Sequence, residues 1–528
     1  MPVTDVLVIG SGGAGLVAAC AARKAGAAVT LVTKSLPGLA SCTAYAGGGF
    51  TLPYGDVTPA KHRSMTLEIG RNLNVPHMLD ALSSEAGEAV PRLRKFGVRI
   101  DMESGHASVA RYGIGPMLGG TGMTLPLVEN ARQNGVAIFD RTMVTGILTS
   151  DGRVSGVRVL DTSKGTLSTI PAKTVIVAAG GAGRMYSRTD NPVRTTGDGF
   201  ALLAELGLPF IDMEFVQFYP MGFAEPGFPV WMIGLNWVDH APVTNEKGEK
   251  FLQTLWSQWG IKNGREANLF TRDRSSRAIA SEWARGGQVW LHVEDVSDTA
   301  WQTPHGSMIR KMFPSSRPPS AGPIRVRPVQ HYFPGGAFVK ADCSTEVKGL
   351  FACGEVTGGT DGANRIGGNA LSMITVFGFR ASESALDYLS AWEPCEAPDQ
   401  HENDRLAPRW LASRSGPSPS ALKKSLNEIT DDKLAVVRNY KGLAAAESLL
   451  DDLWDVQHDM TVASPAELFE AYEARNLVLV ARMVVKAALL REESRGVHYR
   501  EDFPEEKEEW LKHIEIRLRD GDIDTRTF

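Results

Sequence analysis

The feature that most constrains the fold of this 528-residue chain is a buried strand that runs directly into a glycine-rich turn near the N-terminus. Residues 5–9 are almost entirely apolar and are followed by Gly10, Gly12 and Gly15, and then by an alanine-rich stretch typical of a packed helix. A second apolar strand, 27–33, completes a βαβ unit of the kind that binds a dinucleotide. Gly10 permits the tight turn, Gly12 lets a pyrophosphate approach the backbone, and Gly15 lets the helix pack closely on the strand.

The second strand departs from the usual pattern at its end. A carboxylate that bonds a ribose is expected there, and Thr33 and Lys34 stand instead. A threonine hydroxyl can still hydrogen-bond a ribose, although less strongly than a carboxylate does. We therefore expect Thr33 and Lys34 to line a nucleotide site without supplying that carboxylate.

Composition excludes several functional classes. The formal net charge of -5 argues against nucleic acid or an anionic membrane surface as the main partner. The five cysteines include no Cys-x-x-Cys pair, so we expect no disulfide framework, no zinc knuckle and no cysteine-ligated iron–sulfur cluster in this chain. We also expect no signal peptide, and no apolar run reaches the roughly 18 residues that a membrane span needs. The expected location is the cytoplasm.

Two further glycine-rich segments favour a flavin over a nicotinamide nucleotide. Residues 41–50 are small and allow backbone to lie against a flat ring, although a flexible loop is an equal alternative. Residues 174–183 form a second buried strand that runs into glycines, as expected where one long cofactor crosses a sheet. Asp198 either caps the helix that follows it or reaches cofactor hydroxyls or phosphate through ordered water.

The stretch 349–379 combines a third strand, a glycine-rich loop and a helix start. An apolar strand ends in Gly354 and Glu355, the loop carries Arg365, and an apolar helix opens at Asn369. A helix start aims backbone N–H groups and a positive dipole end at one point, where an anionic or electron-rich ligand group belongs. The alternative is an ordinary strand-to-helix loop.

A set of motifs occurs in one order along nearly the whole chain. They are Gly10–Gly15, Ser41–Gly49, Thr196–Gly199, Glu214–Pro220, Asn245–Phe251, Arg272-Asp273, His331-Tyr332, Gly349–Asn369 and Glu493–Pro504. In this combination they resemble the flavoprotein subunit family of succinate dehydrogenase and fumarate reductase, which also includes L-aspartate oxidase and adenylylsulfate reductase. The motifs are specific for the family but not for one substrate.

The resemblance implies an α/β fold with a Rossmann-like FAD-binding domain, an inserted α+β capping domain and a C-terminal helical domain. The expected boundaries are 1–221 and 326–393 for the two parts of the FAD-binding domain, 222–325 for the cap, 394–420 for a linker, 421–504 for the helical domain and 505–528 for a short charged tail.

FAD is the cofactor that the resemblance implies. Glu355 would hold its ribose, and the helix start at 369–372 would present a positive dipole end to the flavin N1/O2 edge. The expected cofactor-binding residues are Gly10, Gly12, Gly13, Ala14, Gly15, Thr33, Lys34, Ser41, Cys42, Thr43, Gly47, Gly48, Ala179, Gly180, Asp198, Gly354, Glu355, Asn369, Ala370, Leu371 and Ser372.

The chain also departs from the family's pattern. Where dehydrogenases and fumarate reductases of the family carry a histidine bonded covalently to the flavin, this chain has Cys42, so we expect non-covalent FAD, with a cysteinyl linkage as the chemical alternative. Tyr219 replaces a histidine that helps to bind a dicarboxylate. The family's proton-relay arginine falls near Trp237, and no other arginine lies close by in the sequence.

Two anchors for an anionic substrate remain, and both follow from the resemblance. Arg365 can form a bidentate bond to a carboxylate, and His331 can donate a hydrogen bond to the same group. Tyr219, Asp239 and His240 are the candidate proton donors. We therefore predict His331, Arg365, Tyr219 and His240 as the catalytic residues.

Bulky residues replace several of the family's polar ones. Trp231, Trp237, Tyr219 and Met221 favour a larger and more apolar cavity than succinate requires, although each ring can instead simply pack the cap. The Arg272-Asp273 pair also has two interpretations: it lies between the cap and the FAD-binding domain, or Asp273 caps a helix whose arginines face solvent.

These patterns predict an FAD-dependent oxidoreductase that works as part of a fumarate reductase-like system. It would transfer a hydride between flavin N5 and a small anionic substrate, in C=C or C–C chemistry but not on plain succinate or fumarate. The alternatives are chemistry at sulfur or nitrogen, and an FAD-carrying electron-transfer or scaffold subunit without its own substrate. A separate iron–sulfur protein subunit or another redox partner would exchange electrons with it, in the cytoplasm or at a membrane through that partner.

Overall fold

The N-terminal part of the chain is built on a mixed sheet. The computed structural model describes residues 3–110, 119–393 and 406–528, and within them seven strands form this sheet, in the order β6-β2-β1-β9-β8-β7 with β16 added beside β9. The strands are β1 (Thr4–Ile9), β2 (Val29–Val32), β6 (Ala137–Phe139), β7 (Thr142–Ser150), β8 (Arg153–Asp161), β9 (Thr166–Val177) and β16 (Leu350–Ala352).

The parallel half of this sheet brings distant segments together. Strand β1 pairs in parallel with β2 and β9, so that Val6 lies between Val29 and Thr174, and β16 pairs in parallel with β9. These strands are buried, as expected for parallel strands covered on both faces. The carboxyl ends of β1, β9 and β16 therefore meet at one edge, although more than 300 residues separate the first from the last.

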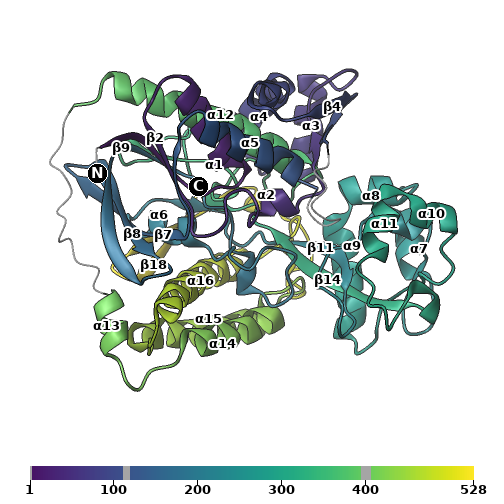
Figure 1. Ribbon diagram of the computed structural model, residues 1–528. Helices are drawn as coiled ribbons and strands as arrows, with labels where there is room; N and C mark the ends of the chain where they lie inside the picture. Colours follow the sequence, from purple (N-terminus) through teal and green to yellow (C-terminus); the bar gives the residue numbers. More distant parts are fainter. Residues whose placement is uncertain (1–2, 111–118, 394–405) are drawn as a thin grey trace.

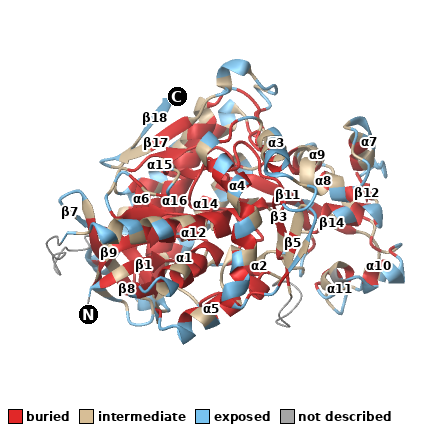
Figure 2. Cartoon of the chain, turned by 90° about the horizontal axis from the view of Figure 1, so that it is seen from above, coloured by how far each residue is buried: buried red, intermediate tan, exposed pale blue. Residues whose placement is uncertain are grey.

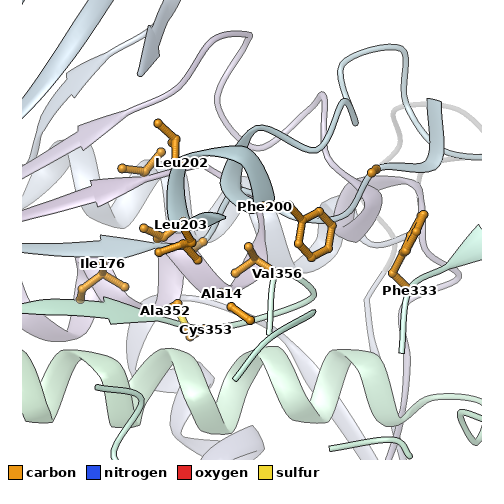
Figure 3. Close-up of a cluster of buried hydrophobic side chains, with 14 of the residues drawn as sticks. Ala14, Ile176, Phe200, Leu202, Leu203, Phe333, Ala352, Cys353 and Val356 are labelled. Atoms are coloured by element: carbon orange, nitrogen blue, oxygen red, sulfur yellow. The ribbon is translucent and has the colours of Figure 1, made fainter. Parts of the chain in front are cut away.

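Helices cover both faces of the sheet. Figure 3 shows Leu202 and Leu203 of α6 (Asp198–Ala204) on one side of the strands that carry Ile176 and Ala352, and the long helix α12 (Asn369–Ser390) on the other. Figure 2 shows that most residues are buried where α12, α1 and β1 stack. The remaining elements of this region are α1 (Gly13–Lys24), α2 (Cys42–Tyr45), β3 (Gly49–Thr51), α3 (Pro59–Ile69), α4 (Pro76–Arg92), β4 (Ile100–Glu103), β5 (His106–Val109) and α5 (Thr121–Gln133).

A separate lobe, the cap, projects from the body (Figure 1). Strands β11 (Gln217–Phe223) and β14 (Ile324–Tyr332) pair antiparallel and carry it, and its own apolar core includes Trp237, Trp256 and Trp301. Its elements are β12 (Val243–Thr244), α7 (Phe251–Gln258), α8 (Gly264–Phe270), α9 (Arg272–Ala284), β13 (Trp290–Leu291), α10 (Asp298–Gln302) and α11 (Pro304–Arg310).

Helices also dominate the chain after residue 405: α13 (Leu406–Ala412), α14 (Pro419–Lys433), α15 (Tyr440–Val456) and α16 (Pro465–Leu490). Ser418 and Ser464 cap α14 and α16, each followed by a proline at the first helical position. The predicted linker, 394–420, contains α13 and the start of α14, so its second half is not an irregular connection; residues 394–405 lie outside the described part. Among the described helices, none combines the length and apolar character that crossing a membrane requires.

The last segment corrects the prediction of a short charged tail at 505–528. Strands β17 (Ile514–Arg519) and β18 (Asp522–Thr527) form a hairpin, and β17 pairs with β10 (Phe210–Ile211), which in turn pairs with β15 (Gly336–Ala337). Ile514 and Ile516 are buried, and the alternation of apolar and charged residues there was the overlooked strand signal. The α/β fold class is confirmed.

Candidate functional site

A first hollow, the strand-end cleft, lies where β1, β2 and β9 end. It is lined by residues 9–14, 32–35, 40–43, 142–144, 178–180, 194–195 and 353–355 and by Asp198, Leu202 and Ile374. Most of these residues are small or contribute backbone. The cleft is therefore suited to a long ligand that lies against main chain at the edge of the sheet.

The glycine-rich turn has the geometry that a close-lying ligand requires. Gly10 has a φ of +105°, and a Cβ there would lie 2.4 Å from the Ala178 carbonyl oxygen, so a side chain is excluded. Within the described part of the chain, a Cβ on Gly12 would meet nothing closer than 3.7 Å. Gly12 is thus free of packing constraints, and its lack of a side chain leaves room on the cleft side for a ligand.

Lys34 is held by acidic side chains from other parts of the chain. Its Nζ lies 2.6 Å from Asp198 Oδ2 and 2.8 Å from Glu473 Oε1 on α16. Burial lowers the pKa of Lys34, but the two carboxylates outweigh burial and raise it above its ordinary value. Thr33 instead shares a 2.8 Å hydrogen bond with the Ser11 hydroxyl. Lys34 therefore joins the C-terminal helices to the cleft, and Asp198 takes part in this cluster.

Glu355 lies where the strand-end cleft meets the second hollow, and it lines both. Its Oε1 accepts a hydrogen bond from the Phe333 N–H at 3.2 Å, and burial raises its pKa to about 7. A buried carboxyl group with a single backbone donor has capacity left to bond hydroxyl groups of a ligand. This position fits the ribose-binding role that the resemblance implies.

The second hollow, the cap cavity, lies between the cap and the body and encloses about 600 Å³. It shares Cys42, Thr43, Glu355 and Ile374 with the strand-end cleft, so the two hollows are continuous. Gly368, Ala370 and Leu371 at the start of α12 also line it, next to the positive end of the helix dipole. The remaining lining residues are Tyr45, Ala46, Gly47, Gly48, Gly49, Thr51, Val57, Met65, Ser104, Gly105, His106, Asp190, Asn191, Trp231, Met232, Arg265, Asn268, Leu269, Arg272, His331, Tyr332, Arg365 and Gly367.

His331 lines the cap cavity, as predicted, and is backed by a carboxylate. Its Nδ1 lies 2.8 Å from Asp190 Oδ2, and Asn191 donates to the other Asp190 oxygen at 3.0 Å. Burial lowers the pKa of His331, although Asp190 raises it in part. With Nδ1 engaged, Nε2 is the ring nitrogen left for a ligand.

Arg365 also lines the cap cavity, and its guanidinium is fixed in place. One amine nitrogen donates to Gln217 Oε1 at 3.1 Å, and the guanidinium carbon lies 4.2 Å from the centroid of the Tyr332 ring. The Nε atom is buried and has no hydrogen-bond partner among the described residues. Arg365 is therefore a rigid cation with unused donor capacity.

A second buried arginine, Arg272, lines the same cavity, although it is 35 positions from Trp237 in the sequence. Its Nε donates to the Asn268 carbonyl at 2.8 Å and an amine nitrogen donates to Asn268 Oδ1 at 3.2 Å. Burial lowers the pKa of Arg272 to about 10. The Arg272-Asp273 motif at a helix start is the sequence feature that indicates this arginine. Distance from Trp237 along the sequence does not indicate it.

The other candidate proton donors do not line the cavity. Tyr219 is buried behind it: its hydroxyl donates to Asn268 Oδ1 at 2.5 Å and accepts from the Leu235 N–H at 3.0 Å. Burial also raises the pKa of Tyr219. His240 and Asp239 are exposed at the surface of the cap. The structure therefore does not bring the predicted His240 to the cavity, and Tyr219 contacts Asn268 instead of lining the cavity.

One of the bulky replacement residues lines the cavity, and others pack inside the cap. Trp231 lines the cap cavity, with its ring centroid 5.5 Å from that of Tyr45. The ring centroids of Trp237 and Trp301 lie 4.9 Å apart, and Met221 belongs to the same apolar core of the cap. Only Trp231 among these replacements shapes the cavity wall.

Three of the predicted cofactor-binding residues line neither hollow and instead make contacts within the protein. A Cβ on Gly15 would lie 2.0 Å from the Gly10 carbonyl oxygen, so this glycine serves close packing. Asn369 bonds the His62 ring and the Thr66 hydroxyl, and Ser372 donates to the Thr51 carbonyl. The other predicted cofactor-binding residues line one hollow or both.

The cap is tied to the body by charged side chains close to the cavity. Asp273 accepts a 2.8 Å hydrogen bond from Arg71 of the body, and the Arg277 guanidinium lies 4.5 Å from the centroid of the Tyr499 ring. The first interpretation of the Arg272-Asp273 pair, between cap and body, is the one that this geometry supports. Asp273 is not the residue that caps α9.

Comparison with known proteins matches most of the chain to the family that its sequence motifs resemble. Residues 5–371 match the family described as FAD binding domain, and residues 423–527 match the family described as fumarate reductase flavoprotein C-term. One relative is a component of the CoM/CoB fumarate reductase of Methanothermobacter marburgensis. The two are 32% identical over 535 residues, covering 97% of this chain and 96% of the relative.

Two further relatives extend the comparison. L-Aspartate oxidase of Streptomyces coelicolor is 31% identical over 546 residues, covering 97% of this chain and 91% of that protein. A solved structure of Escherichia coli quinol fumarate reductase FrdA, a mutant form, superimposes with a TM-score of 0.88 at 27% identity, covering 99% of this chain and 96% of that one.

Proposed function

The chain belongs to the family of FAD-binding fumarate reductase flavoproteins, and from this premise we propose that it transfers a hydride between FAD and a carbon of a carboxylate substrate held in the cap cavity. It is an FAD-dependent oxidoreductase. The observation that carries the proposal is the convergence of Arg272, Arg365 and His331 on a cavity continuous with the strand-end cleft. When bound, FAD supplies two-electron transfer at its ring system.

The residues of the cleft fit FAD. Gly12 has open space where a Cβ would stand, which suits a pyrophosphate against the backbone, and Glu355 has capacity left for ribose hydroxyls. The start of α12 would favour negative charge on the reduced ring. Burial, together with the charge of Glu355, raises the pKa of the Cys42 thiol well above its ordinary value, so it stays protonated. A protonated thiol is a poor nucleophile, which supports non-covalent FAD.

Arg365 and His331 would bind the substrate carboxylate. Arg365 has a free edge for a bidentate contact, and its stacking on Tyr332 fixes its direction. A carboxylate beside His331 raises the pKa of the ring, so binding of the anion and protonation of Nε2 reinforce each other. Asp190 supports the same charge from the other side of the ring.

Arg272 would supply the proton of the reaction. Reduction of a C=C bond consumes two electrons and two protons, and one proton must reach the carbon next to the one that receives the hydride. Burial lowers the pKa of Arg272 to about 10, which makes it a better proton donor than an exposed arginine. Asn268 holds the guanidinium through its backbone and side-chain oxygens, and water would return the proton after each turnover.

A second candidate, oxidation at nitrogen, is favoured by the likeness to an L-aspartate oxidase. In that reaction a neutral His331 would accept a proton from the substrate ammonium group, since burial lowers the pKa of the ring. The relative from Methanothermobacter marburgensis is named as one component of a larger enzyme. On that basis we propose that a separate redox protein, of the iron–sulfur type, exchanges electrons with this chain.

The two candidates give different products, so a single assay separates them. The purified holoenzyme is supplied with reduced methyl viologen and a set of unsaturated acids (fumarate, crotonate, cinnamate), and in parallel with oxygen and L-amino acids. We expect viologen oxidation and formation of the saturated acid. Peroxide formation from an amino acid would replace the first candidate by the second, and the absence of both reactions would contradict the proposal. Protein stripped of flavin is the control.

A further inference from the structure

The lining of the cap cavity has two parts of unlike chemistry. Arg272 and His331, with Arg365, supply fixed positive charge or hydrogen-bond donors, whereas Tyr45, Trp231 and their neighbours are apolar. The apolar part comes from the residue that ends α2, from the segment after β11 and from loops and helices nearby. Its members are Tyr45, Val57, Met65, Trp231, Met232 and Leu269.

The cationic part is built for one anionic head. Asp190 holds His331, Gln217 holds Arg365, and Asn268 holds Arg272, each through a hydrogen bond of 2.8 to 3.2 Å. Arg272 is 7% exposed and Arg365 is 4% exposed, so neither is free to follow a second charge to another place in the cavity. Arg365 and His331 together can satisfy the oxygens of a single carboxylate, and Arg272 is left to donate the proton.

The apolar part offers no comparable partner for a second carboxylate. The Tyr45 and Trp231 rings are 5.5 Å apart between centroids, and Trp231 is 6% exposed. Placing an ionised group against such a wall costs free energy, because Tyr45, Trp231 and Met232 supply no charged partner to replace its hydration. Among the described residues, the other basic side chains of the lining are Arg265, which is exposed to solvent, and His106, which is half-buried on the β5 side of the cavity. An ion pair with an exposed arginine adds little affinity.

Resting on the proposed function, we propose that the substrate is a monocarboxylate with an apolar arm, such as an aryl or long alkyl group, and that the arm lies against Tyr45, Trp231 and Met232. The head would bind at Arg365 and His331. This arrangement makes Trp231 a specificity-determining residue: it selects the length and polarity of the arm, while the cationic residues select the charge of the head.

Binding without turnover tests the proposal directly. Propanoate, 3-phenylpropanoate and succinate are titrated into the oxidised holoenzyme by isothermal calorimetry, with no reductant present. Burial of a phenyl ring is expected to make 3-phenylpropanoate bind at least about tenfold more tightly than propanoate or succinate. If succinate binds as tightly as 3-phenylpropanoate, and Arg265→Ala weakens succinate alone, the cavity has a second carboxylate site and the proposal is wrong.

Matched variants test where the apolar arm of the substrate binds. Trp231→Ala should reduce the affinity for 3-phenylpropanoate to that of propanoate and leave propanoate unchanged. Tyr45→Ala, at a half-buried position in the same wall, makes the same test if Trp231→Ala fails to fold. Trp259→Ala is the control, since Trp259 packs on the cap core and against Arg274 but does not line the cavity. Equal affinity for propanoate and 3-phenylpropanoate overturns this inference alone, whereas failure of all three acids to bind overturns the proposed function.

Discussion

The strand-end cleft and the cap cavity are continuous, yet they are built in different ways. The cleft is made largely of backbone and small residues at the ends of neighbouring strands, so its shape follows from the fold. Glycines and alanines also line the cap cavity, but its charged and bulky groups are single side chains, such as Arg272 and Trp231 from the cap, His331 from β14 and Arg365 from the loop before α12. The comparison indicates that a generic cofactor is held by architecture, whereas the substrate is selected by individual side chains.

The two hollows should therefore respond differently to substitution. A change among the cationic residues of the cap cavity should alter turnover or anion binding and leave the flavin in place. A change in the cleft should alter flavin binding and leave the cationic residues in place. The following variants test this division from the largest expected effect to the smallest.

Arg272→Gln should show the largest effect, a loss of turnover of about 10³-fold, because it removes the proposed proton donor. The measurement is viologen-driven turnover together with flavin content, which should stay at the wild-type level. Arg285→Gln is the control, since Arg285 lies at the other end of α9 with a side chain that is 75% exposed. Loss of flavin in Arg272→Gln, or unchanged turnover, would contradict the division.

Gly12→Ala should weaken FAD binding by about ten- to a hundredfold, because the added methyl group occupies space that the pyrophosphate needs. The backbone at Gly12 has a φ of -74°, which alanine adopts readily, and the methyl group meets no protein atom within 3.7 Å. The thermal stability of the apo-protein should therefore stay unchanged while the Kd for FAD rises. Gly287→Ala in the cap is the control, and equal FAD affinity in both variants would argue against a pyrophosphate at Gly12.

Asp190→Asn should weaken anion binding at pH 7 by about tenfold, the effect of a pKa change of one unit. Asp190 raises the pKa of His331 against the lowering effect of burial, so removing its charge lowers that pKa further. If binding requires the protonated ring, affinity falls as the pH rises through the pKa of His331, and in the variant this fall shifts to lower pH. Anion titrations between pH 5.5 and 8 measure the shift, and identical profiles would remove His331 from anion binding.

Cys42→Ser should show the smallest effect. The Cys42 thiol contacts Asn191 Oδ1 at 3.4 Å and Thr195 Oγ1 at 3.6 Å, and a hydroxyl can make similar contacts. We expect flavin content and turnover within about twofold of wild type, since surface and near-isosteric changes are usually mild. Denaturation of the wild-type protein should release all of the flavin. Flavin that stays with the polypeptide of the wild type but not of the variant would show a cysteinyl bond.

The difference between the hollows also explains how much the sequence predicted. The cleft depends on strands followed by glycines, a local pattern, so Gly10, Gly12 and Gly180 were found directly. The strand, glycine-rich loop and helix around Glu355 and Arg365 form a second local pattern, but the roles predicted for these two residues came from the family resemblance. The hairpin at 514–527 also has a local pattern, the alternation of apolar and charged residues. Its many charged residues favoured the prediction of a tail instead.

Partners brought together by tertiary structure could not be predicted in this way. Glu473 meets Lys34 across 439 positions of sequence, and Arg71 meets Asp273 across 202. Arg272 reaches the cavity because α9 packs beside β11, not because it lies near Trp237 in the sequence. The hypothesis of a scaffold subunit without catalysis depended on a missing arginine, and Arg272 removes that support.

The most direct test of the division is a titration of the flavin absorption spectrum with 3-phenylpropanoate in wild-type protein and in Arg365→Gln at equal flavin content. The account predicts a saturable spectral change in the wild type. In Arg365→Gln it predicts full flavin occupancy and a response that requires at least about a hundredfold more acid, because a buried charged hydrogen bond is lost. Equal responses in the two proteins, or loss of flavin from the variant, would contradict the claim that the cleft and the start of α12 hold the cofactor while the cationic residues of the cap cavity bind the substrate.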